Sequence, residues 1–132
     1  MEVRATISDL LDAARARLDR LEPAAAHRAL VDDGAILIDT RCADLRHEFG
    51  QIPGSVAIPL SVLFWRLDPT SGYDDPRLSD PARLVILVCA HGYSSSLAAA
   101  TLRDIGFSRA TDIVGGFEAW AAAGLPIEPA SD

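Results

Sequence analysis

The chain has 132 residues, 49% of them hydrophobic, so it can bury one core without disulfides or metal ions. Nineteen acidic residues against twelve basic ones give a net charge of -7, which argues against nucleic-acid partners and anionic membrane surfaces. The longest apolar run, residues 84–90, is far shorter than the roughly 20 residues that a membrane helix needs. These counts favour one domain with no nucleic-acid or membrane partner.

The start of the chain and its cysteine content both favour a reducing compartment. The first residues mix acidic and basic side chains and lack the basic-then-apolar layout of a secretory signal. The chain has two cysteines, Cys42 and Cys89, which excludes a disulfide framework. We therefore predict a cytoplasmic protein whose two thiols have to be interpreted separately.

The first part of the chain is predicted to be helical. Apolar residues recur at helical spacing over residues 7–21, and Thr6 or Ser8 is the candidate cap. Pro23 then opens a second helix at a position where a missing N–H costs nothing, and Gly34 ends it.

Beyond residue 34, short apolar runs alternate with helical patterns. The runs contain few polar residues, which is typical of strands that are covered on both faces. The alternation predicts a parallel sheet with right-handed crossovers. A stretch rich in Asp, Pro, Ser and Gly interrupts the alternation at residues 68–81. The predicted strands are residues 35–39, 55–58, 84–88 and 111–114, and the predicted helices are residues 95–105 and 117–123.

Chemistry in such sheets gathers at the carboxyl ends of the strands, which here are residues 39–42 and 89–94. Cys89 ends an apolar strand that runs directly into a helix, so the backbone must turn sharply. Gly92 can make that turn because it tolerates positive φ, which lets successive N–H groups converge on one anion. We predict that Cys89 lies at the mouth of this anion-binding loop.

The helix after the loop adds a second effect on Cys89. The N–H groups of its first turn, and the hydroxyl groups of Ser94, Ser95 and Ser96, can donate hydrogen bonds. Such surroundings lower the pKa of a cysteine from about 8.5 to roughly 3.5–7.5. A cysteine that only fills the core belongs in the middle of a strand, whereas Cys89 begins a glycine-containing turn. We therefore interpret Cys89 as a nucleophile.

Several stretches of the chain resemble the motifs of the rhodanese family. The sequence Cys89-Ala-His-Gly-Tyr-Ser94 resembles the active-site loop of its single-domain members. Residues 38–41 are similar to the early Asp-x-Arg motif, residues 52–60 to the second motif and residues 114–126 to the closing motif. Each motif alone is weak, but their order and spacing over residues 23–127 are specific.

The resemblance implies a three-layer α/β fold, with a central, mainly parallel sheet of about five strands and helices on both faces. Residues 23–132 would form the rhodanese-like domain, and residues 1–22 an N-terminal helix packed on or flanking it. The residues that would bind the substrate anion are Ala90, His91, Gly92, Tyr93, Ser94 and Ser95.

The resemblance also implies a ping-pong transfer of sulfur. Cys89 would attack the outer sulfur of thiosulfate or a similar donor, sulfite would leave, and a persulfide would remain. A nucleophilic acceptor, cyanide or a thiol, would then remove that sulfur. Converging N–H groups suit this chemistry because they stabilise both a thiolate and a persulfide anion. The implied partners are small molecules, and we expect a monomer or a weak homodimer.

The chain departs from the family pattern in two places. Family loops often carry a basic residue, whereas the only ionisable cation here is His91. Arg66, which lies just before residues 68–81, is a candidate for the missing substrate cation. Gln51 stands where a histidine commonly precedes the second motif, and we assign it no catalytic role.

Three more side chains lie near the predicted edge of the sheet. Asp39 and Arg41 are two residues apart at a strand end, where an ion pair would brace the rim of the site, and we favour this structural role. Cys42 follows on the same edge as Cys89 and could pair with it only if their Cα atoms came within about 7 Å. We interpret Cys42 as an incidental thiol.

The histidines do not form a metal-binding pattern. His27, His47 and His91 are scattered, and no second cysteine is close to Cys89 in the chain. We predict neither a metal nor an organic cofactor, and we assign Phe117 and Trp120 to the core.

Two other functions are alternatives to sulfur transfer. A cysteine-dependent phosphatase needs an arginine that closes the loop, but the position six after Cys89 is Ser95, and the next arginine is Arg103. A binding or regulatory module that has lost its chemistry is the second alternative, and the presence of Cys89 argues against it.

Overall fold

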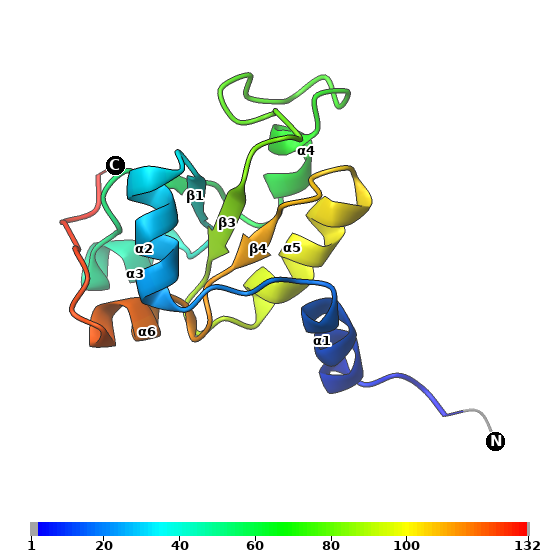
Figure 1. The fold of residues 1–132 in the computed structure, drawn as a ribbon, viewed down its shortest axis with the longest axis horizontal. Coiled ribbons are helices and arrows are strands. Elements are labelled where there is room, and N and C mark those ends of the chain that lie inside the picture. The colour runs from blue at the N-terminus through cyan, green and yellow to red at the C-terminus, as the bar shows by residue number, and fades with distance from the viewer. Residues whose placement is uncertain (1–2, 132) are drawn as a thin grey trace.

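The computed structural model describes residues 3–131, which form a parallel sheet between two layers of helices (Figure 1). The four strands lie in the order β2-β1-β3-β4. They are β1 (Ile36–Asp39), β2 (Val56–Ala57), β3 (Val85–Val88) and β4 (Thr111–Asp112). The helices are α1 (Ile7–Ala16), α2 (Pro23–Asp32), α3 (Ala43–Phe49), α4 (Leu63–Leu67), α5 (Ser94–Asp104) and α6 (Gly116–Ala122). The predicted α/β class with a parallel sheet is confirmed.

The central strands β1 and β3 are buried along their whole length. Because successive side chains of a strand point to opposite faces, these strands contribute to two cores. The core under α4 and α5 contains Ile36, Ile38, Val85 and Leu87, together with Leu63, Leu67, Ala99 and Leu102. The core under α2 and α6 contains Leu37, Ile86 and Val88, together with Ala26, Phe117 and Trp120. The assignment of the two aromatic residues to the core is confirmed.

The expected count of about five strands was one too high for the described residues. A fifth chain segment does reach the sheet, but Leu21 makes only an isolated parallel bridge to Ile113, beyond β4. Its N–H donates to Asp112 O at 3.0 Å, and its carbonyl accepts from Val114 at 2.9 Å. Pro23 begins α2 two residues later, so no chain is left to extend the pairing.

The first helix is shorter than the predicted residues 7–21. Thr6 caps α1 through a capping box, but the helix ends at Ala16. The chain then extends so that Leu18 can enter the core and Leu21 can reach the sheet. Figure 1 shows α1 standing at the edge of the domain, where it lies against α5.

Two helices were absent from the predicted elements. Helix α3 has no buried residue and α4 has five residues, so neither produces a clear amphipathic pattern. Residues 68–81 form the predicted loop, which projects from the molecule beyond α4 (Figure 1). Over residues 3–131, no helix is long and apolar enough to cross a membrane.

Candidate active site

The strand register brings the two predicted functional segments to one edge of the sheet. Asp39 pairs with Val88, and the Thr40 N–H donates to the Val88 carbonyl at 3.0 Å, so residues 39–42 run beside the start of the Cys89 loop. Cys89 is 7% exposed. Its sulfur nevertheless has polar neighbours, as the next contacts show.

The Cys89 sulfur accepts a hydrogen bond from the backbone N–H of Gly92 at 3.2 Å. It also lies 3.2 Å from the hydroxyl oxygen of Ser95. Burial by itself raises the pKa of the thiol, but hydrogen bonds from Ser95, Ser94 and Gly92 outweigh it, and the pKa lies below its ordinary value. The thiolate is therefore stabilised by donors rather than by a neighbouring cation.

The start of α6 holds two loop carbonyls away from the sulfur. The Phe117 N–H donates to Cys89 O at 2.8 Å, and the Glu118 N–H donates to Ala90 O at 3.1 Å. In a trans peptide the C=O and the following N–H point in opposite directions. These contacts therefore turn the N–H groups of Ala90 and His91 away from α6.

The Gly92 carbonyl is held in the same way from another direction. Gly92 adopts the predicted positive φ, 83°. Its carbonyl accepts from Arg15 at 2.7 Å and from Arg20 at 3.1 Å, and the Ser96 hydroxyl oxygen lies 3.3 Å away. Because this peptide is also trans, the N–H of Tyr93 points the opposite way.

A glycine is required under the loop as well as within it. Gly116 has a φ of +64°, and a Cβ at this position would lie 2.5 Å from Cys89 O and 2.7 Å from Gly92 N. A Cβ on Gly92 would in turn lie 2.9 Å from the backbone nitrogen of Gly115. The backbone of the loop therefore packs directly against the backbone at the start of α6. No space is left for a side chain at Gly92 or Gly116.

Two serines of the loop and the following helix bind a buried carboxylate instead of facing an anion. The hydroxyl groups of Ser95 and Ser96 each donate to Oδ2 of Asp112 at 2.7 Å. Asp112 is fully buried, and the Arg20 guanidinium donates to its Oδ1 at 2.8 Å. Of the three serine hydroxyl groups expected to serve the anion, two are thus directed to Asp112.

The Asp39–Arg41 pair lies at the end of β1 with both side chains almost completely buried. Arg41 donates to Asp39 at 2.7 Å and to the Gly50 carbonyl at 2.7 Å, and its guanidinium lies 3.7 Å from the centre of the Phe117 ring. This is the geometry that a bracing role at the rim requires, because every strong contact of Arg41 goes to protein groups.

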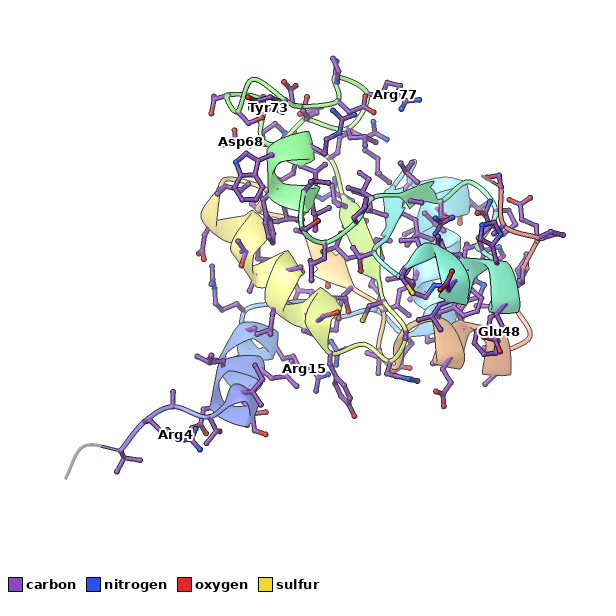
Figure 2. The ribbon with its side chains drawn as sticks, turned by 180° about the vertical axis from the view of Figure 1, so that it is seen from behind. Arg4, Arg15, Glu48, Asp68, Tyr73 and Arg77 are labelled. Atoms are coloured by element: carbon purple, nitrogen blue, oxygen red, sulfur yellow. The ribbon has the colours of Figure 1, made fainter. Side chains whose placement is uncertain are left out.

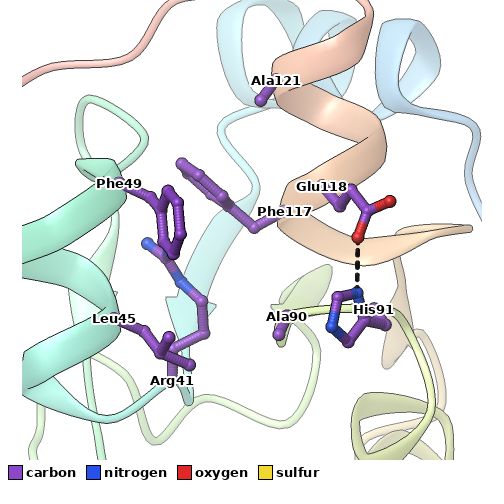
Figure 3. Close-up of a pocket in the computed structure, with 8 residues that line it drawn as sticks. All are labelled: Arg41, Leu45, Phe49, Ala90, His91, Phe117, Glu118 and Ala121. Atoms are coloured by element: carbon purple, nitrogen blue, oxygen red, sulfur yellow. Dashed lines mark ion pairs between the residues drawn. The ribbon is translucent and has the colours of Figure 1, made fainter.

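A cavity of about 260 Å³ opens beside the loop (Figure 3). Its walls are mostly apolar and come from α3, α6 and the loop. At its edge, Nδ1 of His91 lies 2.8 Å from the Glu118 carboxylate, which offsets any charge on the imidazole. The lining residues are Arg41, Leu45, Phe49, Ala90, His91, Phe117, Glu118 and Ala121.

The structure does not bring Arg66 to the Cys89 loop. Its guanidinium donates to the Tyr73 carbonyl at 2.7 Å and faces Asp75 at 3.8 Å. Figure 2 shows Tyr73 and Arg77 on the projecting segment, well away from Arg15. Arg66 therefore stabilises the projecting segment through Tyr73 and Asp75.

Cys42 and Gln51 have no contact with the Cys89 sulfur in the described structure. Cys42 is exposed, and both cysteines are free thiols. Gln51 pairs through its backbone with Glu128, and its side-chain amide donates to the Ser131 hydroxyl at 3.3 Å. Within residues 3–131, no group of His, Cys, Asp or Glu side chains is arranged to hold a metal ion.

Comparison with known proteins identifies the fold that carries this loop. A family model described as "Rhodanese-like domain" matches residues 22–123. The chain belongs to the rhodanese-like family. Among curated relatives, thiosulfate sulfurtransferase GlpE of Actinobacillus succinogenes is 31% identical over 83% of this chain and 90% of its own length. The GlpE of Pseudomonas syringae pv. syringae is 39% identical over 76% and 85% of the two chains.

The two GlpE proteins identify the chain as a member of the single-domain rhodanese-like sulfurtransferases. A solved Rhodopseudomonas palustris protein of unknown function, described as a possible tyrosine phosphatase, is 33% identical, with a TM-score of 0.86. The match covers 97% of this chain and 98% of that one. The likeness between the two chains therefore extends beyond residues 22–123 of the rhodanese-like domain.

Three residues that contact the loop or its serines were not predicted from the sequence: Arg15, Arg20 and Asp112. Asp112 left a usable signal, because it is a charged residue in a run that was predicted to be a strand covered on both faces. The two arginines left none, since each looks like an ordinary polar position at the end of a helical pattern.

Proposed function

We propose that this rhodanese-like protein transfers sulfur from thiosulfate, or a similar sulfane donor, to a thiol or cyanide through a persulfide on Cys89. The observation that carries the proposal is the hydrogen bond from the Gly92 N–H to the Cys89 sulfur at 3.2 Å, in a loop whose carbonyls are held outward. The relatives named thiosulfate sulfurtransferase support the choice of donor.

In the first step, the Cys89 thiolate attacks the outer sulfur of thiosulfate. A new S–S bond forms to Cys89, the S–S bond of thiosulfate breaks, and its electron pair leaves with sulfite. The negative charge on Cys89 moves outward by one atom, from Sγ to the terminal sulfur. The N–H groups of Ala90, His91 and Tyr93 are the donors that this moved charge would meet.

In the second step, the acceptor attacks the terminal sulfur of the persulfide. Cyanide forms a carbon–sulfur bond and leaves as thiocyanate, while a thiolate acceptor leaves as a new persulfide. In both cases the electron pair of the broken S–S bond returns to Cys89 as thiolate. Donors of the same loop would therefore stabilise both the resting thiolate and the persulfide, and covalent capture divides one difficult transfer into two easier ones.

The arrangement of the loop argues against phosphatase chemistry. Phosphoryl transfer needs a guanidinium that faces the bound anion, but Arg15 and Arg20 contact the loop through the Gly92 carbonyl. The residue six positions after Cys89 is Ser95, which binds Asp112. A thiol acceptor and a cytoplasmic location are part of this proposal.

Mass measurement after incubation with thiosulfate tests the proposal. The intact protein should gain one sulfur atom, and added cyanide should remove it and release thiocyanate. The Cys89→Ser variant should gain nothing, whereas Cys42→Ser should behave like the wild type. Turnover by Cys89→Ser would eliminate Cys89 as the nucleophile, and no gain with any sulfane donor would favour a binding module instead.

A further inference from the structure

We propose that Arg15 and Arg20 are positioning residues of the active site, which hold the Gly92 peptide and neutralise Asp112 behind the Cys89 loop. Both arginines precede residues 22–123, the part of the chain that matches the family model. The inference rests on the proposed function of the loop but concerns a different segment. On this inference, the segment before the rhodanese-like domain contributes to the active site through Arg15 and Arg20.

Arg15 reaches the loop from the last turn of α1. Its Nη2 donates to the Gly92 carbonyl at 2.7 Å and its Nε donates to the Ser96 hydroxyl oxygen at 3.2 Å, while its guanidinium lies 5.5 Å from the centre of the Tyr93 ring. Arg15 has no carboxylate partner among the described residues. Its positive charge therefore lies next to a loop that contains neither lysine nor arginine.

The Gly92 peptide needs this anchoring because glycine crosses easily between backbone conformations. If the peptide between Gly92 and Tyr93 flipped, a carbonyl would replace an N–H on the inner side of the loop. A carbonyl oxygen facing an anionic sulfur is repulsive, whereas an N–H is stabilising. Two donors on the outer side, from Arg15 and Arg20, oppose that flip.

Arg20 acts through the buried carboxylate. The hydroxyl of Ser95 has one hydrogen, which it gives to Asp112 when the Cys89 thiol donates to Ser95. Once the sulfur is anionic, Ser95 has to turn that hydrogen to the sulfur. Asp112 remains satisfied, because Ser96 donates to it at 2.7 Å and Arg20 at 2.8 Å.

Without Arg20, the Asp112 carboxylate would be an uncompensated buried charge one hydroxyl away from the anionic sulfur. Like charges in a buried site disfavour each other strongly. The other charged groups around the loop are arranged in pairs, His91 with Glu118 on the α6 side and Asp39 with Arg41 at the end of β1. Arg15 and Arg20 therefore act on the sulfur through the Gly92 peptide and Asp112 rather than by direct contact.

The pH dependence of Cys89 alkylation by iodoacetamide tests this role in the full-length protein. Tryptic digestion separates residues 84–103, which contain Cys89, from residues 42–46, which contain the exposed Cys42, so mass spectrometry follows each thiol. Arg15→Gln should raise the alkylation midpoint by about one pH unit, with a tenfold lower thiolate fraction below it. Arg20→Gln should raise it further, and Arg20→Lys, which keeps the charge, should raise it less than Arg20→Gln.

Arg17→Gln is the matched control, because Arg17 leaves the end of the same helix but pairs with exposed Asp104. It should keep the wild-type midpoint. If Arg20→Gln does not fold, Arg15→Gln still decides the question, since it leaves no buried carboxylate unpaired.

The inference is overturned if folded Arg15→Gln has the wild-type midpoint, or if Arg17→Gln shifts the midpoint equally. Alkylation needs no sulfur donor, so this result is independent of the sulfur-gain experiment that tests the proposed function.

Discussion

Two Asp-x-Arg sequences in this chain fold into the same local structure in different surroundings. In both Asp39–Arg41 and Asp75–Arg77, the arginine N–H donates to Oδ1 of the aspartate at 3.0 Å. Nη2 then donates to Oδ2 at 2.7 Å in both pairs. The spacing permits this hydrogen-bonded ion pair but does not dictate it, because Asp44 and Arg46 have the same spacing inside α3, where Arg46 Nε has no hydrogen-bond partner among the described residues.

The surroundings differ as much as the local geometry agrees. The Arg41 side chain is 2% exposed and contacts Gly50 and Phe117, whereas the Arg77 side chain is 81% exposed on the projecting loop. The same contacts thus lie buried at the end of β1 in one place and stabilise a surface loop in the other. The energetic value of an ion pair depends on what replaces it when it breaks, which is water at Arg77 and apolar protein at Arg41.

The largest expected effect is that of Arg41→Gln. The substitution leaves the buried Asp39 carboxylate without its cation, and breaking a buried pair in this way typically costs about 3–5 kcal/mol. Urea unfolding followed by circular dichroism should show that loss in the free energy of unfolding. A loss below about 1 kcal/mol would mean that the buried pair behaves like a surface pair.

The double variant Asp39→Asn/Arg41→Gln should be more stable than Arg41→Gln alone. Removing both charges avoids an unpaired buried carboxylate, so part of the lost free energy returns. Comparing the urea midpoints of the two variants measures the difference. If the second substitution added to the first loss, desolvated charge would not be the cause.

Arg77→Gln should cost only a small fraction of the Arg41→Gln loss in the same unfolding experiment. Water replaces the exposed guanidinium on Asp75, which also keeps Arg66 within 3.8 Å. A loss equal to that of Arg41→Gln would show that the projecting loop contributes to the stability of the whole domain.

The smallest expected effect is the loss of the Asp75–Arg77 interaction at low pH. Hydrogen bonds from Arg77 lower the pKa of Asp75 from 3.8 to about 2. Because the folded-state pKa is depressed, the stabilisation is complete above pH 3.8 and disappears as the pH falls through about 2. The NMR shift of the Arg77 amide proton should titrate with that midpoint in the wild type and lose the transition in Asp75→Asn. A midpoint near 3.8 would mean that the pair does not persist in solution.

What could be predicted from the sequence depends on whether a feature is determined within one element or by contacts between distant parts of the chain. The apolar runs, Pro23 and Gly34 are signals within one element, and they correctly indicated α2 and the strands. The seven residues of α3 bury no side chain and so leave no periodic pattern. The described sheet has four strands where about five were expected, because Leu21 makes only a single bridge, which depends on where the chain meets β4.

The site divides in the same way. Cys89 and Gly92 are three residues apart, so one short loop identified both. The hydrogen bonds from Arg15 and Arg20 to Gly92 span 77 and 72 residues, and the bond from Arg20 to Asp112 spans 92. No sequence spacing encodes such contacts, because they depend on the path of the chain between α1 and the sheet.

The loop around Cys89 is clasped by segments from opposite parts of the chain: Arg15 and Arg20 precede the domain, and Gly116 and Phe117 follow most of it. During synthesis on the ribosome, the sulfur emerges before the glycines that must lie beneath it. An incomplete nascent chain lacks the contacts from Gly116 and Phe117 that hold the loop, and long-range contacts of this kind form late in folding. On the proposed function, the reactivity of Cys89 therefore depends on the whole chain having folded around it.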